Sequence, residues 1–156
     1  RELLNRELAL ELALDIAFGP ASDFFAAHYG LIAGDAFGAE VYAEPTFCFC
    51  AVGGYTQYSE RLGVEIAATL TRLEALIEAD FARAKRKAYG QLLRSCEQVD
   101  QVADLLCSAA ISSAEPGDYF DIYDCITATQ VRAALEDCLR PALMGAVQIV
   151  PNGSLG

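Results

Sequence analysis

The chain has 156 residues, of which 54% are hydrophobic, and its formal net charge is −11 because 22 acidic side chains face 11 basic ones. This length suffices for one domain with its own core, predicted over residues 1–156. The negative charge argues against nucleic acid or an anionic membrane as a partner, because nucleic-acid affinity depends mainly on Lys and Arg.

The apolar residues do not form a membrane span, since no apolar run approaches the roughly 20 residues that a membrane helix needs. The surplus of apolar side chains is therefore expected to be buried inside the domain or against other polypeptide. The chain begins at Arg1 without an initiator Met or a signal sequence, inside what reads as a helix. We expect a piece of a longer protein, with a processed mature protein as the alternative.

The first elements are predicted to be two helices. Helical spacing of leucines, with acidic residues opposite, indicates a helix from Glu2 to Phe18. Gly19 is predicted to end it, and Ser22 and Asp23 to cap a second helix that runs to Tyr29.

Two strands are predicted next, from Phe37 to Glu44 and from Thr46 to Val52. The first alternates between apolar and polar residues, which indicates one wet face, whereas the second is apolar on both faces, as in a covered central strand. Pro45 separates the two runs, so antiparallel pairing is expected. Gly53-Gly54 favours a turn over a phosphate loop, because no Gly-Lys-Ser/Thr follows.

The rest of the chain is predicted to be mainly helical, with Thr127 and Gln130 spaced as a capping box and a last strand over Ala146 to Val150. The expected helices are Ser59 to about Ile77, Glu78 to about Ser95, Val99 to Ile111, Asp118 to Ile126 and Thr127 to Arg140. Pro141 ends the last helix. This order predicts an α+β fold, an antiparallel sheet covered on one face by several helices, with further strands supplied upstream of Arg1.

The chemistry-bearing residues favour no catalytic site. His28 is the one histidine, so the chain cannot supply the three ligands typical of a hydrolytic zinc, and no Gly-x-Ser-x-Gly elbow is present. A capping or packing role at a helix end is favoured for His28. No catalytic residue and no metal ligand is assigned to this chain.

The six cysteines lie in apolar segments, which favours reduced, buried thiols in a cytoplasmic protein. The alternative is a structural zinc held by Cys48 and Cys50 with ligands from scattered helices. Arg83 and the basic run from Lys85 to Lys87 favour a solvated helix face. Pairing of these cations with an acidic surface of another domain is the functional alternative.

Several segments, in order, resemble the pitrilysin/insulinase zinc peptidases, and most closely a bacterial branch associated with elongation factor P modification. They are ELALELALDIAFG at Glu7 to Gly19, Pro20 to Gly54 with its GLI, FG and AEP motifs, EADFARAKRKAYGQ at Glu78 to Gln91, ITATQVRAALEDCL from Ile126 and GAVQIVPNG from Gly145. The resemblance covers nearly the whole chain.

The resemblance implies a place in a larger enzyme. Members of this family have two homologous α+β halves around a peptide-binding chamber, and zinc sits in one half on a His-x-x-Glu-His motif with a distant Glu. This chain matches the later part of the metal-free C-terminal half, truncated at its N-terminus. No cofactor is therefore expected in this fragment, whereas zinc is expected in the missing catalytic half. The parent chain is expected to be a zinc metallopeptidase, although the fragment alone is not an enzyme.

The family also places an Arg and a Tyr from this half against the peptide at the scissile bond. These substrate-binding positions fall here at Ala26 and near Phe37, and neither side chain can make the polar contact. Two hypotheses follow: a substrate-enclosing, non-catalytic domain of a zinc endopeptidase, or a scaffold or partner module of an inactive pseudo-peptidase subunit. The expected partners are the catalytic half, in the same or another chain, and a peptide substrate. A third alternative is an unrelated α+β interaction domain.

Overall fold

The computed structural model describes residues 1–32, 36–138 and 143–150. In chain order its elements are α1 (Glu2–Phe18), α2 (Asp23–His28), the 3-10 helix η1 (Tyr29–Leu31), β1 (Gly38–Glu44), β2 (Phe47–Gly53), α3 (Ser59–Leu70), α4 (Leu73–Ser95), α5 (Val99–Ile111), α6 (Asp118–Cys125) and α7 (Ala128–Cys138). The α+β prediction is confirmed: helices cover one face of an antiparallel sheet that has two strands in the described part.

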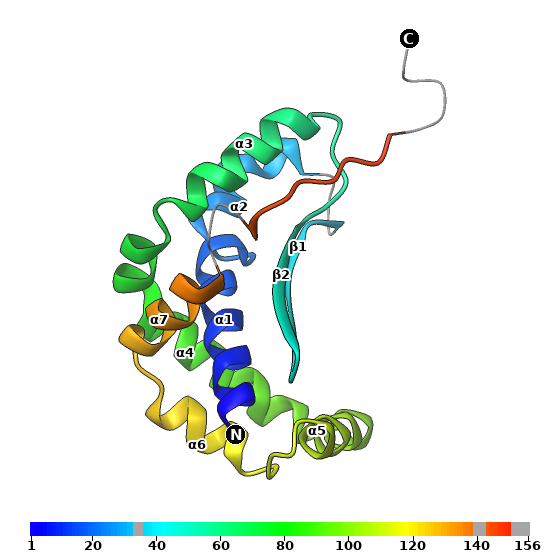
Figure 1. Ribbon diagram of the computed structural model, residues 1–156, viewed down its shortest axis with the longest axis vertical. Helices are drawn as coiled ribbons and strands as arrows, with labels where there is room; N and C mark the ends of the chain where they lie inside the picture. The colour runs from blue at the N-terminus through cyan, green and yellow to red at the C-terminus, as the bar shows by residue number, and fades with distance from the viewer. Residues whose placement is uncertain (33–35, 139–142, 151–156) are drawn as a thin grey trace.

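Helix α1 is the centre of the core. It packs against β1 on one side and against α4 and α7 on the other (Figure 1). Leucines and alanines recur on nearly every side of this helix, which is typical of a helix enclosed by neighbours. Leu4 and Leu10 are completely buried. The N–H of Gly19 then bonds to the Asp15 carbonyl as the helix ends, as predicted.

The hairpin of β1 and β2 has one face against α1 and one face in solvent. Val41 lies opposite Cys50 on the half-buried face, and Tyr42 lies opposite Phe49 on the outward face. The prediction that β2 is covered on both faces is wrong, because Phe49 is 50% exposed. Antiparallel pairing puts alternate residues of both strands on the same side, and no described element packs on the outward side.

The helical half largely follows the prediction, with one shifted boundary. The break lies between α3 and α4 at Thr71 and Arg72 and not after Ile77. The Thr71 hydroxyl donates to the Ala68 carbonyl there, a local bond that competes with helix continuation. Ile77 is fully buried within α4, so its packing favours a longer helix than its sequence neighbourhood suggested.

The C-terminal predictions have different outcomes. The capping box is confirmed, since the Thr127 N–H donates to Gln130 Oε1 at 2.9 Å and the Gln130 N–H donates back to Thr127 Oγ1 at 3.4 Å. The predicted strand at Ala146 to Val150 is wrong, because the described segment 143–150 contains no strand. A strand needs an edge to pair with, and this segment pairs with neither described strand. Arg140 and Pro141 lie outside the described residues.

Candidate functional site

The two predicted substrate-binding positions lie in different surroundings. Ala26 is exposed on α2. Phe37 is only 8% exposed and packs in the core, its ring centroid 5.4 Å from that of Phe24 and 6.4 Å from that of Phe18. Phe37 also borders an open cleft of about 500 Å³ that runs along β1 to Tyr42. A contact of either position with substrate stays a prediction.

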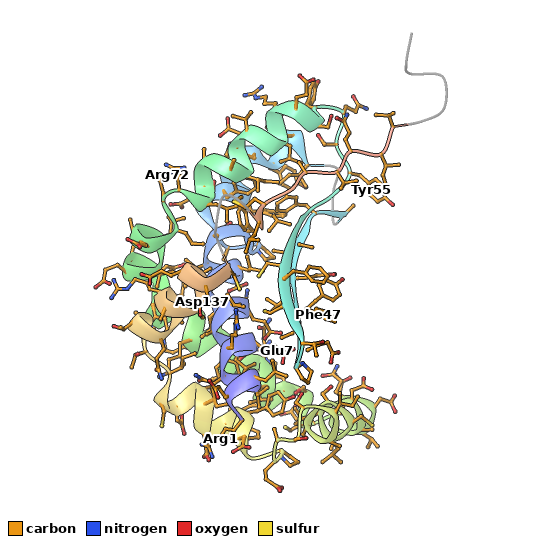
Figure 2. The ribbon with its side chains drawn as sticks, viewed as in Figure 1. Arg1, Glu7, Phe47, Tyr55, Arg72 and Asp137 are labelled. Carbon is orange, nitrogen blue, oxygen red and sulfur yellow. The ribbon has the colours of Figure 1, made fainter. Side chains whose placement is uncertain are left out.

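The outward face of the hairpin carries a cluster of aromatic rings, here named the outer aromatic face: Tyr42, Phe47 and Phe49. The Tyr42 and Phe49 rings stack at 4.7 Å, and the Phe47 and Phe49 rings lie 6.0 Å apart. Their exposed fractions are 44%, 52% and 50%, and Figure 2 shows Phe47 directed away from α1. Aromatic side chains supply large contact areas at binding surfaces.

Sequence reasoning missed the outer aromatic face, although a signal was present. Glu40, Tyr42 and Glu44 mark the wet side of β1. In an antiparallel hairpin with a two-residue turn, their cross-strand neighbours share that side, so Phe47 and Phe49 had to be exposed as well. The Tyr42 hydroxyl donates to the Glu40 carboxylate, a bond that raises the pKa of Tyr42.

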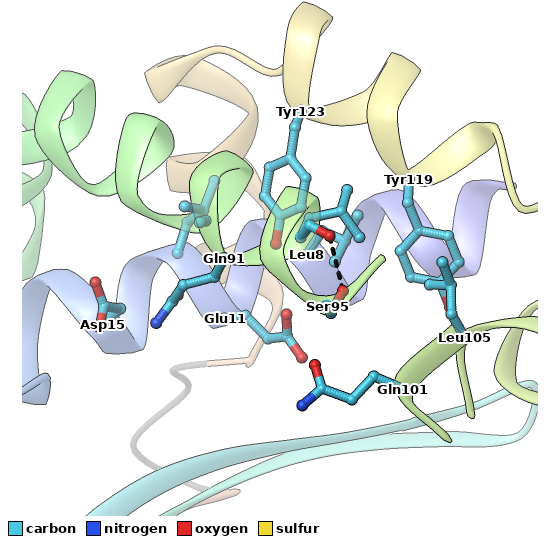
Figure 3. A pocket seen from close by; sticks show the side chains of 12 residues that line it. Leu8, Glu11, Asp15, Gln91, Ser95, Gln101, Leu105, Tyr119 and Tyr123 are labelled. Atoms are coloured by element: carbon cyan, nitrogen blue, oxygen red, sulfur yellow. Dashed lines mark hydrogen bonds between the residues drawn. The ribbon is translucent and has the colours of Figure 1, made fainter. Parts of the chain in front are cut away.

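A second hollow, the inner cleft, lies between α1, α4, α5 and α6 and has a volume of about 420 Å³. Figure 3 shows that Glu11 and Gln101 point into it, with Tyr119 and Tyr123 on the wall supplied by α6. Glu7, Glu11 and Asp15 follow one another every four residues and so lie along one side of α1. Glu11 and Asp15 therefore give the cleft two carboxylates, and Glu7 lies one turn beyond them on α1.

Burial, and then repulsion between neighbours, changes the protonation of Glu7 and Glu11. Burial raises the pKa of Glu11 to about 7, with the charge of Glu7 adding to the effect. Burial, and then the nearby charge of Glu44, raise the pKa of Glu7 as well. Burial also raises the pKa of Tyr123. Asp15 is compensated by an ion pair with Lys87 of α4. The Glu11 carboxyl is thus a proton-binding group near neutral pH.

Glu11→Gln is expected to stabilise the protein in alkaline solution. The folded pKa of Glu11, about 7, exceeds its ordinary value of 4.5, so the folded state holds the proton more tightly. The resulting destabilisation is absent below pH 4.5, grows as the pH rises, and is complete above pH 7. Solvent reaches this side chain, so we expect a discounted gain of about 1 kcal/mol at pH 8 and none at pH 4.5.

Urea denaturation of both proteins at the two pH values measures this difference. The matched control is Glu97→Gln at an exposed position between α4 and α5, which is expected to change stability by less than about 0.5 kcal/mol at either pH. Equal stability of the Glu11 variant and the parent sequence at pH 8 would contradict the prediction.

His28 has structural contacts and no site around it. Its Nδ1 lies 2.9 Å from the Phe24 carbonyl oxygen, and its Nε2 lies 3.3 Å from Glu65 Oε2. The ring also packs on the Phe24 ring at 4.6 Å, so the predicted capping or packing role is confirmed. Among the described residues, no group of three or more His, Cys, Asp or Glu side chains could hold a metal ion. The residues present therefore do not fit a zinc centre.

Three cations of the predicted basic run form ion pairs or hydrogen bonds with other residues of the chain. Arg83 pairs with Asp80 one turn earlier. Lys85 Nζ donates to the backbone carbonyls of Asp124 and Ile126 at 3.0 and 3.1 Å, where α6 ends. Lys87 pairs with Asp15, as described above. The prediction of a solvated face is therefore wrong for Lys87, which joins α4 to α1, and for Lys85, which joins another side of α4 to α6.

The cysteines divide into two groups. Cys96, Cys107 and Cys125 are exposed, so the prediction of burial is wrong for them. Cys48, Cys50 and Cys138 are half-buried, and all six thiols are free. Cys96 directly follows α4, whereas Cys107 and Cys125 lie on α5 and α6. In the part of the chain that the structure describes, no helix is long and apolar enough to cross a membrane.

Comparison with known proteins relates the chain to peptidases. No family model matches it. It is 27% identical over 155 residues to the uncharacterized zinc protease YmfH of Bacillus subtilis (strain 168), a match that spans 97% of this chain and 36% of the relative. Its fold superposes on a crystal structure of an M16-like peptidase from Alicyclobacillus acidocaldarius with a TM-score of 0.80 and 25% identity, over 89% of this chain and 34% of that one.

These similarities support the resemblance to pitrilysin/insulinase-type peptidases. The chain spans about a third of the length of the proteins that it matches. It is therefore similar to one part of a peptidase, and the described residues of that part do not include a metal-binding group.

Proposed function

We propose that the chain is a non-catalytic, substrate-enclosing part of a zinc-dependent endopeptidase that acts on peptides. The similarity to a zinc protease and to an M16-like peptidase over nearly all of the chain supports this proposal. The zinc belongs to the catalytic half, which we propose as the principal partner, in the same or a separate chain. The bacterial branch associated with elongation factor P modification and a cytoplasmic location are part of the same proposal.

The observation that carries the proposal is the outer aromatic face. Three neighbouring rings are about half exposed on the hairpin, although large aromatic side chains are mostly buried in a monomer. Such a surface suits the side chains of an extended peptide. In the described sheet each strand has one unpaired edge, and a peptide can add to such an edge through backbone hydrogen bonds.

Further apolar exposure supports a contact with other polypeptide. Val99 and Ile111 of α5 are 85% and 73% exposed, and Val147 and Ile149 near the C-terminus are 92% and 93% exposed. These residues belong to α5 and to the segment that passes the start of α3 (Figure 1), and Ile111 lines a hollow with Glu44 and Pro45 at the hairpin turn. We propose that they pack on the catalytic half and on the remainder of the parent protein.

The test is Phe49→Ala in the full-length parent peptidase. Loss of a half-exposed ring from a binding wall is expected to cost about 1 kcal/mol of substrate binding, or roughly a fivefold rise in KM with kcat unchanged. Steady-state kinetics with a fluorogenic peptide measure both constants. The matched control is Tyr55→Ala, a 77% exposed ring in the loop after β2, which is expected to leave KM unchanged. An unchanged KM for the Phe49 variant would contradict the proposal.

The second candidate is a scaffold or partner module of an inactive pseudo-peptidase. The observation that favours it is the absence of polar side chains at Ala26 and Phe37, where the resemblance implies an Arg and a Tyr. Metal analysis of the purified full-length parent separates the two candidates. About one zinc per chain, with peptide hydrolysis lost on chelation, supports the peptidase, whereas no zinc and no hydrolysis support the pseudo-peptidase.

A further inference from the structure

Carboxylates stand beside the rings of the outer aromatic face. Glu40 and Glu44 flank Tyr42 on β1, and all three side chains are exposed. Residues two positions apart lie on the same side of a strand, so both carboxylates are on the side that carries the rings. On β2, Phe47 lies opposite Glu44 and Phe49 lies opposite Tyr42, and the rings are stacked. The surface therefore combines three rings with two negative charges.

These two carboxylates are not neutralised by the described part of the chain. The ion pairs among the described residues involve neither Glu40 nor Glu44. The Tyr42 hydroxyl, which is uncharged, donates to the Glu40 carboxylate and holds it near the ring. Neither strand of the hairpin contains Lys, Arg or His. Glu44 also borders the hollow at the hairpin turn, which Glu7 and Asp104 line as well, so negative charge continues around the turn.

We propose that the outer aromatic face binds basic peptide segments, with Arg side chains that pack on the rings and pair with Glu40 and Glu44. This inference rests on the proposed function, because it names the class of peptide that the substrate-enclosing part binds. A cation is attracted to the electron-rich face of an aromatic ring, and a neighbouring carboxylate adds an ion pair. Guanidinium groups suit both contacts, because they are planar, stack on rings and form two parallel hydrogen bonds to a carboxylate.

Other occupants fit this surface less well. In a two-fold contact between copies of the chain the same patch meets itself, so Glu40 and Glu44 would face like charges. The phosphates of nucleic acid or of an anionic membrane would meet the same repulsion. No group of three or more His, Cys, Asp or Glu among the described residues could hold a metal ion. A basic peptide complements both the charge and the apolar surface of the face.

The spacing of the two carboxylates predicts a pattern in the peptide. Glu40 and Glu44 are four positions apart, which is about 13 Å along an extended strand. An extended peptide presents every second side chain on one side. Two cations four positions apart, with an aromatic residue midway, therefore match the two carboxylates and the rings between them. The sequence Arg-Ser-Phe-Ser-Arg has this pattern, with serine on the side that points away.

The experiment measures equilibrium binding of fluorescein-labelled Gly-Arg-Ser-Phe-Ser-Arg-Gly to the full-length parent by fluorescence anisotropy. Excess EDTA prevents metal-dependent hydrolysis, so binding is read separately from catalysis. The comparison peptide carries citrulline, an uncharged residue of nearly the same shape, in place of each Arg. We expect the Arg peptide to bind roughly tenfold tighter at low salt, because two exposed cations each contribute roughly threefold. In about 1 M NaCl, which screens charges beyond about 3 Å, the preference is expected to fall below about threefold.

Two sets of variants assign the contacts. Glu40→Gln combined with Glu44→Gln is expected to weaken binding of the Arg peptide roughly fivefold and to leave the citrulline peptide unchanged. The matched control, Glu74→Gln combined with Glu97→Gln, changes the net charge equally at exposed positions and is expected to alter neither affinity. Phe49→Leu keeps an apolar side chain but removes the ring, so we expect the Arg peptide to lose roughly threefold more affinity than the citrulline peptide. Far-UV circular dichroism checks that each variant folds.

Several results would overturn the proposal. Equal affinities for the Arg and citrulline peptides would do so, and so would equal losses for the two pairs of glutamate variants. A parent dimer that dissociates when Phe49 is changed, as measured by analytical ultracentrifugation, would assign the face to a second copy in place of a peptide.

The proposed function is tested separately, by peptide hydrolysis with zinc present. Hydrolysis without any preference for the Arg peptide would keep the peptidase function and reject the basic-peptide surface. Preferential binding of the Arg peptide by a parent without zinc would support the basic-peptide surface and reject the zinc peptidase.

Discussion

Leu10→Ala is expected to lower the free energy of unfolding by about 3 kcal/mol, because truncation of a fully buried leucine removes its transfer free energy and leaves a cavity. Leu10 is 0% exposed in the middle of α1, the helix that touches β1, α4 and α7. Its neighbours are held by several elements at once and cannot collapse far into the space. A loss of this size is a large share of the stability of an ordinary domain.

Urea denaturation at neutral pH measures the loss, and an unchanged slope would show that the two-state transition is kept. The matched control is Leu106→Ala, which removes the same atoms from another helix, α5, where the side chain is 50% exposed. We expect the control to lose less than about 1 kcal/mol. Equal losses for the two variants would contradict the central position of α1.

Gly54→Ala is expected to destabilise the protein by about 2 kcal/mol through overpacking. A Cβ at Gly54 would lie 2.5 Å from the Ala36 carbonyl oxygen and 2.6 Å from the Phe37 Cα, both of them backbone atoms that cannot swing away. Relief of the clash requires the segment before β1 to move, and with it the Phe37 ring in the core.

The adjacent Gly53 supplies the control, because a Cβ there would meet no atom within 4 Å. Gly53→Ala is therefore expected to change stability by less than about 1 kcal/mol. Thermal denaturation of both variants compares the two positions. If both glycines tolerate Ala equally, the close approach at Gly54 is not important for folding.

The sequence predicted local structure well where a local signal was sufficient. The capping box at Thr127 and Gln130 identified the start of α7, and Gly19 identified the end of α1. The two-residue turn at Pro45 and Thr46 led to the antiparallel hairpin. Each of these features depends on neighbours within about four residues, so the sequence contains all of the necessary information.

Long-range packing decided the features that the prediction missed. The break between α3 and α4 is earlier than expected because Ile77 finds a buried place within α4. The apolar segment Ala146 to Val150 forms no strand, because it pairs with neither described strand. Lys85 and Lys87 were predicted to lie on a solvated helix face. Only the fold brings Lys85 to the end of α6 and Lys87 to Asp15.

The candidate sites also differ in how far the sequence alone could predict them. The outer aromatic face could have been predicted from the sequence, because the register of the hairpin follows from its turn. The inner cleft could not, because no local pattern brings α1, α4, α5 and α6 together. The position of Phe37 in the core likewise depends on Phe18 and Phe24 from two helices.

By itself the sequence determined that this chain has no His-x-x-Glu-His motif, since it has one histidine, and that it folds as helices around a short antiparallel hairpin. Composition and local periodicity are enough for both conclusions. Only the tertiary structure decided which apolar side chains stay in solvent and which carboxyl binds a proton near neutral pH. These properties arise from contacts between elements far apart in the chain, where burial and charge depend on the neighbours that folding supplies.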